Sequence, residues 1–383
     1  MFPPAQRGAA GVGSHRVRPP ARAPPPAGGL RACDRRCGII GDVYTGAGTR
    51  GDREAADGVG LGRARRRGRR RPVVAALSVL TLLVLSVPLA FRAGDEDGPT
   101  PVPQLLAFLP WFLAPAWLAA LGAAFARRWL VLLWALAVLA GTGWFLRPYG
   151  PPAPGDAAGR PAKAQFRVLT ANLKYGAATA DLVATVRRER PQIVALQECD
   201  ARCARELRDP VLREEYPHRI ITGGGGARGS ALLSIYPLHN RSEVRGRLSM
   251  PGAVADVHGE RVALQVAHPM PPMPAGTGAW RVELDRLRAA ADARGKLPTL
   301  MAGDFNSSQD HAAFRAILKT GMRDAARMLG NSRTPTWPTR TTPLLGAQID
   351  HVLLSETLLP VDGKFLDLRG TDHRALLVNV KLL

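Results

Sequence analysis

The chain of 383 residues is poor in cysteine, in acidic residues and, at its beginning, in large apolar side chains. It has 4 cysteines. Cys33 and Cys37 lie in the basic N-terminal region, where a structural zinc site would need further ligands, and none stands out. The first 71 residues are rich in Arg, Gly, Pro and Ala, and such a stretch cannot bury enough apolar surface to offset its ordering entropy. We therefore expect residues 1–71 to be a disordered basic tail.

Acidic residues are outnumbered, because 52 Lys and Arg face 31 Asp and Glu and leave a net charge of +21. Residues 1–164 hold 22 of the basic and 9 of the acidic residues, whereas residues 165–383 hold 30 and 22. A run of arginines from Arg63 to Arg71 directly precedes an apolar segment. A cytoplasmic membrane anchor explains this run better than a nucleic-acid-binding tail does. The basic excess of residues 165–383 suits an anionic substrate or lipid head groups and does not choose between them.

Three apolar runs follow the arginines, at Pro72–Phe91, Pro103–Ala126 and Trp129–Leu146. Each is near the ~20 residues that cross the hydrocarbon core of a bilayer as a helix. A signal peptide accounts for only one such run, so the three predict a transmembrane anchor of three helices over residues 72–146. Buried helices of a soluble domain are the alternative. Residues 147–164, rich in Pro, Gly and Ala, are predicted to be a linker to a soluble domain at 165–383.

The charges of the loops predict the orientation of this anchor. The arginine run before the first apolar run stays in the cytoplasm, and so do Arg127 and Arg128 between the second and third runs. The loop Arg92–Val102 carries three consecutive acidic residues and crosses. Three crossings place the C-terminal domain outside the membrane, whereas an arrangement with two spans would put it in the cytoplasm.

Polar residues follow the ends of several predicted strands in the C-terminal domain. The segments Phe166–Asn172 and Ile193–Glu198 read as strands, and Asp181–Arg190 between them has helical spacing, which predicts a strand–helix–strand unit. Later predicted strands also border polar groups. The polar residues at these strand ends are Asn172, Glu198, His268, Asp304, Asn306, Asp350, Asp372 and His373.

Each of these residues taken alone has an ordinary structural explanation as a turn former, a helix cap or a loop histidine. Taken together they are the set that metal-assisted hydrolysis of a phosphate ester requires. Mg²⁺ prefers hard oxygen ligands, which carboxylates supply. A carboxylate or imidazole must position the attacking water, and hydrogen-bond donors must stabilise charge on the phosphoryl oxygens. The pattern therefore predicts a hydrolase of phosphate esters.

The order of these residues, with Ser230–Pro237 between the glutamate and the first histidine, resembles the endonuclease/exonuclease/phosphatase superfamily over nearly all of residues 165–383. The resemblance implies an α/β fold of the DNase I-like kind. This is a four-layer α/β/β/α sandwich, in which two sheets pack face to face with helices outside. In this chain it would be preceded by three transmembrane helices and a disordered basic N-terminus.

The resemblance also implies which residues hold a metal ion. Glu198 is expected to be the principal ligand of Mg²⁺, with Mn²⁺ as the alternative ion. Asn172 would lie beside it and hold the metal or the substrate phosphate. Asp372 would support the metal.

The remaining residues are expected, by the same resemblance, to act in catalysis. Asp304 would orient the nucleophilic water, and Asn306 would donate to the phosphoryl oxygens as a substrate-binding residue. His373, oriented by Asp350, would bind the phosphate or share in proton transfer. His268 matches the position of the catalytic histidine in the nuclease and sphingomyelinase branches.

A narrower resemblance concerns the layout of the whole chain. A basic tail, three spans and an external domain are similar to the teicoplanin-resistance membrane proteins of streptomycetes, which implies a polyprenyl-linked phosphate or pyrophosphate as the substrate at the outer face of the cell membrane. The expected partners are the lipid bilayer and this phosphorylated lipid, and no obligate protein partner is evident.

Two other functions compete with this one. An extracellular nuclease acting on DNA or RNA is disfavoured by the anchor and by the lack of an insertion with aromatic and basic residues for a DNA groove. A catalytically inactive, membrane-tethered binding module is disfavoured because it has no need of the intact catalytic set. The sequence does not name the substrate, the number of metal ions or the oligomeric state.

The pairing of Cys199 with Cys203 stays open. An oxidising compartment permits a disulfide, but a spacing of four residues on a helix is an awkward geometry for one. Four other histidines are expected to be surface or loop residues, namely His218, His239, His258 and His311.

Overall fold

In a computed structural model of the chain, residues 57–148, 159–342 and 344–383 are described. The predicted disorder of residues 1–56 and most of the predicted linker lie outside this part. The chain divides into two units between Gly58 and Val59. Apart from Asp57 and Gly58, the residues described below belong to the second unit.

The first element is a helix of 37 residues, α1 (Asp57–Ala93). It begins earlier than expected, so that residues 57–71, which we predicted to be disordered, are helical. Arginine has a high helix propensity, and extending an existing helix fixes one residue for each hydrogen bond gained, so the apolar part continues into the arginine run. Within the described residues, Arg70–Ala93 is the single helix long and apolar enough to cross a membrane.

The second and third apolar runs form shorter helices than predicted. The second run is divided into α2 (Val102–Leu106), the 3-10 helix η1 (Leu109–Phe112) and α3 (Leu113–Phe125). Pro110 lies in the first turn of η1, where a missing N–H is tolerated, and so it starts a new element instead of continuing the previous one. The third run forms α4 (Trp129–Phe145) with 17 residues. Three transmembrane helices are therefore not confirmed.

The C-terminal domain contains two sheets of six strands each, in the orders β11-β12-β1-β2-β4-β3 and β5-β6-β7-β8-β10-β9. The first sheet is formed by β1 (Ala164–Asn172), β2 (Ile193–Gln197), β3 (His218–Thr222), β4 (Ser230–Ser234), β11 (Leu358–Asp367) and β12 (Arg374–Leu382). The second is formed by β5 (Leu238–Glu243), β6 (Pro251–Val257), β7 (Glu260–Ala267), β8 (Thr299–Asp304), β9 (Arg323–Asp324) and β10 (Asp350–Leu354).

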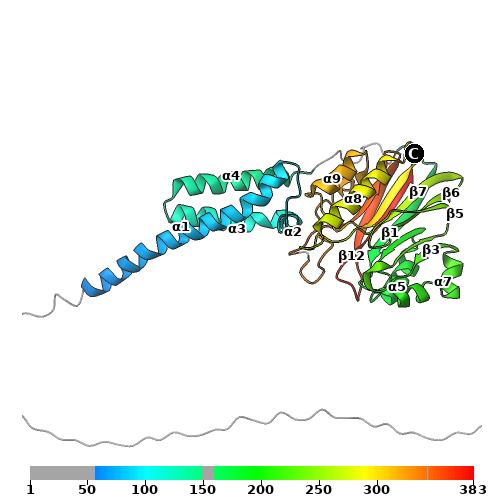
Figure 1. Cartoon of the computed structure of the whole chain (residues 1–383), viewed down its shortest axis with the longest axis horizontal. Helices are drawn as coiled ribbons and strands as arrows, with labels where there is room; N and C mark the ends of the chain where they lie inside the picture. Colours follow the sequence, from blue (N-terminus) through cyan, green and yellow to red (C-terminus); the bar gives the residue numbers. More distant parts are fainter. Residues whose placement is uncertain (1–56, 149–158, 343) are drawn as a thin grey trace, which may run out of the picture. The chain divides into compact units, whose positions relative to one another are not determined.

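Alternation along the strands divides the apolar residues between two faces. Val168 of β1 packs between the sheets against residues of the second sheet such as Leu264, whereas its neighbour Leu169 faces a helical layer. The outer face of the first sheet is covered by α5 (Thr179–Glu189), α6 (Ala201–Glu206) and α7 (Pro210–Glu215), and that of the second by α8 (Thr277–Asp292) and α9 (Ala312–Lys319) (Figure 1). The short helix α10 (Ala325–Met328) precedes β10. Two sheets packed face to face with helices outside are thus confirmed.

The strand directions bring the predicted site residues to one edge of this sandwich. β1 and β2 are parallel, and so are β7 and β8, so the carboxyl ends of each pair lie together. β10 runs antiparallel to β8 and starts with Asp350 directly opposite Asp304. β12 runs antiparallel to β1, so His373, the residue before β12, lies near the end of β1. The topology therefore collects the polar strand ends in one place.

Candidate active site

Asn172, the last residue of β1, joins two carboxylates that come from different sheets. Its Nδ2 donates to Oε1 of Glu198 at 3.1 Å and to Oδ2 of Asp304 at 3.0 Å. Its Oδ1 accepts from the backbone N–H of Lys174 at 3.0 Å, and the N–H of Tyr175 donates to Oε2 of Glu198 at 3.0 Å. The amide therefore bridges the carboxylates through its nitrogen, and its oxygen is engaged by the backbone. Its predicted role at the metal or phosphate stays a prediction.

Two of the site residues have left-handed backbone conformations, Glu198 with φ 55° and Asn306 with φ 47°. Asn tolerates this region well, but for Glu it is uncommon and unfavourable. Close packing against Gly229 holds the backbone after Glu198. The N–H of Cys199 donates to the carbonyl of Gly229 at 2.9 Å, and a Cβ on Gly229 would lie 1.9 Å from the carbonyl oxygen of Cys199. The close packing against this glycine fixes the direction of Glu198.

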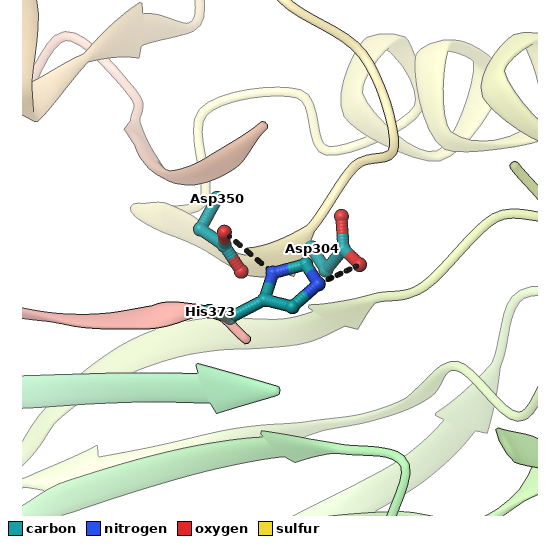
Figure 2. Close-up of side chains that lie close together, drawn as sticks. All are labelled: Asp304, Asp350 and His373. Carbon is teal, nitrogen blue, oxygen red and sulfur yellow. Dashed lines mark hydrogen bonds and ion pairs between the residues drawn. The ribbon is translucent and has the colours of Figure 1, made fainter. Parts of the chain in front are cut away.

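His373 lies between two aspartates, as Figure 2 shows. Its Nδ1 is 2.9 Å from Oδ2 of Asp350, and its Nε2 is 3.9 Å from Oδ2 of Asp304. All three side chains are almost fully buried. The predicted pairing of Asp350 with His373 is present, 23 positions apart in the sequence, and it leaves Nε2 directed toward the carboxylate at the end of β8.

Burial and the neighbouring charges have opposite effects on the pKa of His373, and likewise on the pKa of Asp304. Burial alone would lower the pKa of His373, but the adjacent carboxylates of Asp350 and Asp304 outweigh it and raise this pKa to about 9. Burial raises the pKa of Asp304 to about 7, and the positive charge of His373 partly opposes that rise. His373 is therefore cationic at neutral pH, and Asp304 is close to its point of ionisation.

The donor set suits a hard divalent cation. The ligand atoms of Asp304, Asp350 and His373 lie within 4.8 Å of one another. Cationic His373 has no free lone pair, so the carboxylates are the available donors, and the Asn172 amide ties the carboxylate of Glu198 to that of Asp304. In the part of the chain that the structure describes, the buried Oδ1 of Asp350 has no hydrogen-bond partner. Clustered carboxylates with an unsatisfied oxygen favour Mg²⁺ or Mn²⁺ over softer metals.

The other predicted site residues lie around this cluster. Asn306 receives a hydrogen bond on its backbone carbonyl from Trp280 at 3.1 Å and donates through Nδ2 to the carbonyl of Pro269 at 3.0 Å. Asp372 forms an ion pair with Lys174 at 3.4 Å. His268 is buried, and burial, aided by the charge of His373, lowers its pKa to about 3, so it is neutral at physiological pH.

A cavity of about 490 Å³ opens above these residues. Six of the predicted residues line it, whereas Asn172 and Asp350 lie behind them. The six are Glu198, His268, Asp304, Asn306, Asp372 and His373. Much of the remaining lining is apolar and comes from loops outside the strand ends; it includes Ala107, Phe108, Leu248, Met270, Pro271, Pro272, Met273, Trp337 and Ile349.

Several residues that support or line the site were not predicted from the sequence. The hydroxyl of Thr371 donates to the carbonyl of Asn172 at 2.8 Å and accepts from the N–H of His373 at 3.1 Å. The hydroxyl of Thr336 accepts from the N–H of Asp350 at 3.2 Å. Thr371 stands next to a predicted residue and was recognisable by that position. Phe108 lies in an apolar run far from the motifs, and no local signal marks it.

The open question of the cysteines is answered by a disulfide between Cys199 and Cys203. Cys199 precedes α6, whose N-terminal cap is Asp200. Only one cysteine is therefore inside the helix, and the Cα atoms approach to 5.2 Å, within the range that a disulfide spans. The bond closes a loop directly after Glu198.

One histidine departs from expectation. His311 was expected at the surface or in a loop, but it is fully buried in the turn before α9. Its Nδ1 accepts from the N–H of Ser308 at 2.8 Å, and its Nε2 donates to the carbonyl of Pro103 at 2.7 Å. These two partners fix a neutral imidazole, and burial lowers its pKa.

Comparisons with known proteins identify similar chains. A model of the endonuclease/exonuclease/phosphatase family matches residues 169–373. No curated protein gives a match. Among solved structures, humanized D. rerio TDP2 has a TM-score of 0.48 at 15% identity, covering 57% of this chain and 99% of that one. An endonuclease/exonuclease/phosphatase from Beutenbergia cavernae has a TM-score of 0.47 at 19% identity, with 57% and 72% covered. The human Nocturnin catalytic domain with bound sulfate has a TM-score of 0.46 at 17% identity, with 58% and 95% covered.

Proposed function

The chain belongs to the endonuclease/exonuclease/phosphatase family, and we propose that it is a membrane-anchored, metal-dependent hydrolase of lipid-linked phosphate esters. In this proposal the catalytic domain faces out of the cell, and polyprenyl phosphates or pyrophosphates are the substrates. The family supports hydrolysis of phosphate esters, and the other parts of the proposal rest on the observations below.

The cavity over the carboxylates carries the proposal. Its floor is formed by the carboxylate and imidazole cluster, and much of the rest of its lining consists of apolar and aromatic side chains. A nucleic acid presents phosphates at a charged, solvated surface and calls for basic residues beside the scissile bond. In the described residues, Lys174 is the one Lys or Arg that lines the cavity, and it pairs with Asp372. The lining therefore favours a phosphate group joined to a hydrocarbon chain.

The geometry suggests a division of labour among the residues. Asp304 positions the attacking water, because its carboxylate reaches the cavity and burial raises its pKa to about 7. Cationic His373, held by Asp350 through Nδ1, keeps its Nε2–H for a phosphoryl oxygen. Glu198 would hold the cation through its carboxylate, which lines the cavity and is positioned by the Nδ2 of Asn172. A bound Mg²⁺ or Mn²⁺ supplies positive charge that stabilises the phosphoryl oxygens.

The helical region supports attachment to a membrane. Besides the long apolar helix, α3 and α4 expose large apolar side chains such as Leu118, Trp129 and Leu130, with 69%, 69% and 82% of their surface accessible. A continuous exposed apolar surface marks contact with lipid or another protein. Internal contacts of these helices use smaller residues such as Ala120 and Ala135. The arrangement is that of a helical bundle whose outer surface suits lipid.

Two observations support an external catalytic domain. Asp95 and Asp97, in the loop after α1, bind residues of α9, so this loop and the catalytic domain lie on the same side of any membrane that α1 crosses. The arginine run in the first part of α1 favours the cytoplasm for the opposite side. The disulfide between Cys199 and Cys203 suits an oxidising compartment.

A substrate panel tests the proposed function. The full chain in detergent is given Mg²⁺ and, in separate reactions, farnesyl diphosphate, sphingomyelin and plasmid DNA, with a chelator control for each. We expect release of phosphate from the diphosphate and loss of that release with the chelator. Cleavage of DNA alone would instead identify a nuclease, and cleavage of none with the metal present would favour the inactive binding module.

A reporter fusion tests the orientation. A C-terminal reporter that is active only outside the cytoplasm should give signal, because the arginine run and the pair Arg127 and Arg128 keep their side of the anchor inside. Signal from a cytoplasm-only reporter at the same position would contradict the proposed orientation.

A further inference from the structure

The cavity of the catalytic domain is completed by a segment from outside that domain. Residues 94–112, which we call the connecting segment, join α1 to α3 and contain α2 and η1. Three residues of this segment line the cavity next to the catalytic residues, namely Gln104, Ala107 and Phe108. A segment that merely tethered the domain would have no reason to form part of its catalytic cavity.

The connecting segment is fastened to α9 by two carboxylates. Oδ1 of Asp97 accepts from the N–H of Ala312 at 2.6 Å, and its Oδ2 accepts from the N–H of Ala313 at 3.1 Å. These are the first two residues of α9, which has no side-chain cap of its own at His311. Asp97 is only 7% exposed. It therefore acts as the N-terminal cap of a helix more than 200 positions away and compensates its free N–H groups.

The second carboxylate, Asp95, binds one face of the same helix. Its Oδ1 accepts from Nη2 of Arg315 at 2.6 Å, and its Oδ2 accepts from Nζ of Lys319 at 2.5 Å. The two basic residues are four positions apart and so lie on one face of α9. Asp95 and Asp97 together hold the segment at two points of α9, and we call these contacts the α9 clamp.

Further along, the connecting segment is held on both sides of the cavity. The carbonyl of Pro103 accepts from Nε2 of the buried His311 at 2.7 Å. Nε1 of Trp111 donates to the carbonyl of Gly346 at 3.2 Å. Gln104 donates through Nε2 to the carbonyl of Pro272, which also lines the cavity. The position of the segment over the cavity is therefore set by hydrogen bonds to three separate loops of the domain.

Between these fastenings an aromatic pair faces the cavity. The rings of Phe108 and Trp337 lie 6.2 Å apart, tilted by 53°, and both line the cavity. Met270 and Met273 also line it, and Met273 is 56% exposed. Methionine and aromatic side chains adapt well to flexible apolar ligands. The carboxylates of the floor adjoin these side chains in the same cavity, so one ligand can contact both.

We propose that the connecting segment is the specificity element of the enzyme, in which Phe108, together with Trp337, binds the hydrocarbon chain of the phosphoester while the α9 clamp keeps the segment in place. This inference rests on the proposed function and names the residues that select its substrate class. A single chain-bearing ligand is the occupant because the apolar surface is continuous with the phosphate-binding floor. Selection would then occur at the junction between the long apolar helix and the catalytic domain.

The test compares two substrates that share a head group and differ in chain length. Farnesyl diphosphate and dimethylallyl diphosphate are given to the full chain and to Phe108→Ala in the same detergent. We expect KM for the farnesyl substrate to rise roughly tenfold, because the lost ring contact removes apolar burial, while kcat is kept. For dimethylallyl diphosphate, neither constant should change appreciably. Phe125→Ala, an exposed aromatic position at the end of α3 outside the cavity, is the matched control and should change neither substrate.

A double-mutant cycle tests the α9 clamp. Asp97→Ala should also raise KM for the farnesyl substrate, and adding it to Phe108→Ala should have less than the additive effect, because both variants disable the same subsite. Asp95→Asn, which leaves the helix cap intact, is the milder second variant if Asp97→Ala folds poorly. Additive effects, or equal losses on both substrates, would show a purely structural role and overturn the proposal.

The outcomes separate this inference from the proposed function. If the chain hydrolyses farnesyl diphosphate and Phe108→Ala leaves the ratio of the two substrates unchanged, the specificity role is wrong and the proposed function stands. If neither diphosphate is hydrolysed while DNA or sphingomyelin is, the proposed function fails and the inference fails with it.

Discussion

The floor and the wall of the catalytic cavity are built in different ways. The floor consists of residues at strand ends, where hydrogen-bonded neighbours set each position; the register that places Asp350 opposite Asp304 is an example. The wall consists of side chains from loops and from the connecting segment, among them Phe108, Met270 and Trp337. Sheets hold groups rigidly, whereas loops vary without loss of the fold.

This difference suggests that chemistry and substrate selection are separable in this protein. Changes to the floor should affect every substrate in the same proportion. Changes to the wall, such as Phe108→Ala, should affect only substrates that carry a long hydrocarbon chain. Comparing two substrates in each variant therefore shows to which of the two regions a residue belongs.

The largest effect is expected from the floor. Glu198→Ala and Asp304→Ala should each lower kcat by ~10²-fold or more, because each removes a group that we propose to bind the cation or position the water. The loss should be equal for farnesyl and dimethylallyl diphosphate, as measured by phosphate release. Both variants should keep the far-ultraviolet circular dichroism of the parent chain. Near-normal turnover in both would refute the assigned roles, and a loss confined to one substrate would break the distinction between floor and wall.

A smaller effect, visible in the pH profile, is expected from the pair behind the floor. Burial alone would lower the pKa of His373, but the charge of Asp350, together with that of Asp304, outweighs it and raises this pKa to about 9. The cationic form is therefore lost only as the pH rises through that value. Asp350→Asn removes one of these charges, and the alkaline limb of kcat should therefore move to lower pH for both substrates.

A second histidine–aspartate pair provides the control for this experiment. Nδ1 of His351 lies 3.0 Å from Oδ2 of Asp324, both residues are buried, and neither lines the cavity. Asp324→Asn should leave the pH profile in place whatever it does to stability. A profile that does not move in Asp350→Asn, or that moves equally in both variants, would mean that His373 needs another role.

The smallest effect on catalysis is expected at the rim of the floor. Replacing Cys199 and Cys203 with serine opens a short loop and should lower the free energy of unfolding by about 2 kcal/mol, as loop-closure entropy predicts. This loss of stability is measured by thermal unfolding of the parent chain and of the variant, each with and without a reductant. The reductant should lower the midpoint of the parent and leave the variant unchanged. A loss of activity at a temperature at which the variant is still folded would show that the disulfide positions Glu198 directly.

Much of the catalytic floor was predictable because strand ends carry local signals. Alternating apolar residues mark β1 and β7, and a polar residue directly after such a segment is visible without knowledge of the fold. The predicted helix Asp181–Arg190 corresponds to α5 within two residues at its start. The helix start at Asp57 was missed because the composition of residues 57–71 suggested disorder, whereas their arginines favour a helix once one is formed. Only the apolar part of α1 shows where that helix is nucleated.

The sequence by itself determined the order of the candidate site residues along the chain and the family to which the domain belongs. Periodicity and motif spacing are properties of short segments, so they can be recognised in the sequence without knowledge of the fold. Only the tertiary structure decided that the connecting segment lines the cavity, that Asp97 caps α9 and that His311 is buried. Each of these depends on residues about 200 positions apart, whose contact depends on how the segments pack and leaves no local pattern to read.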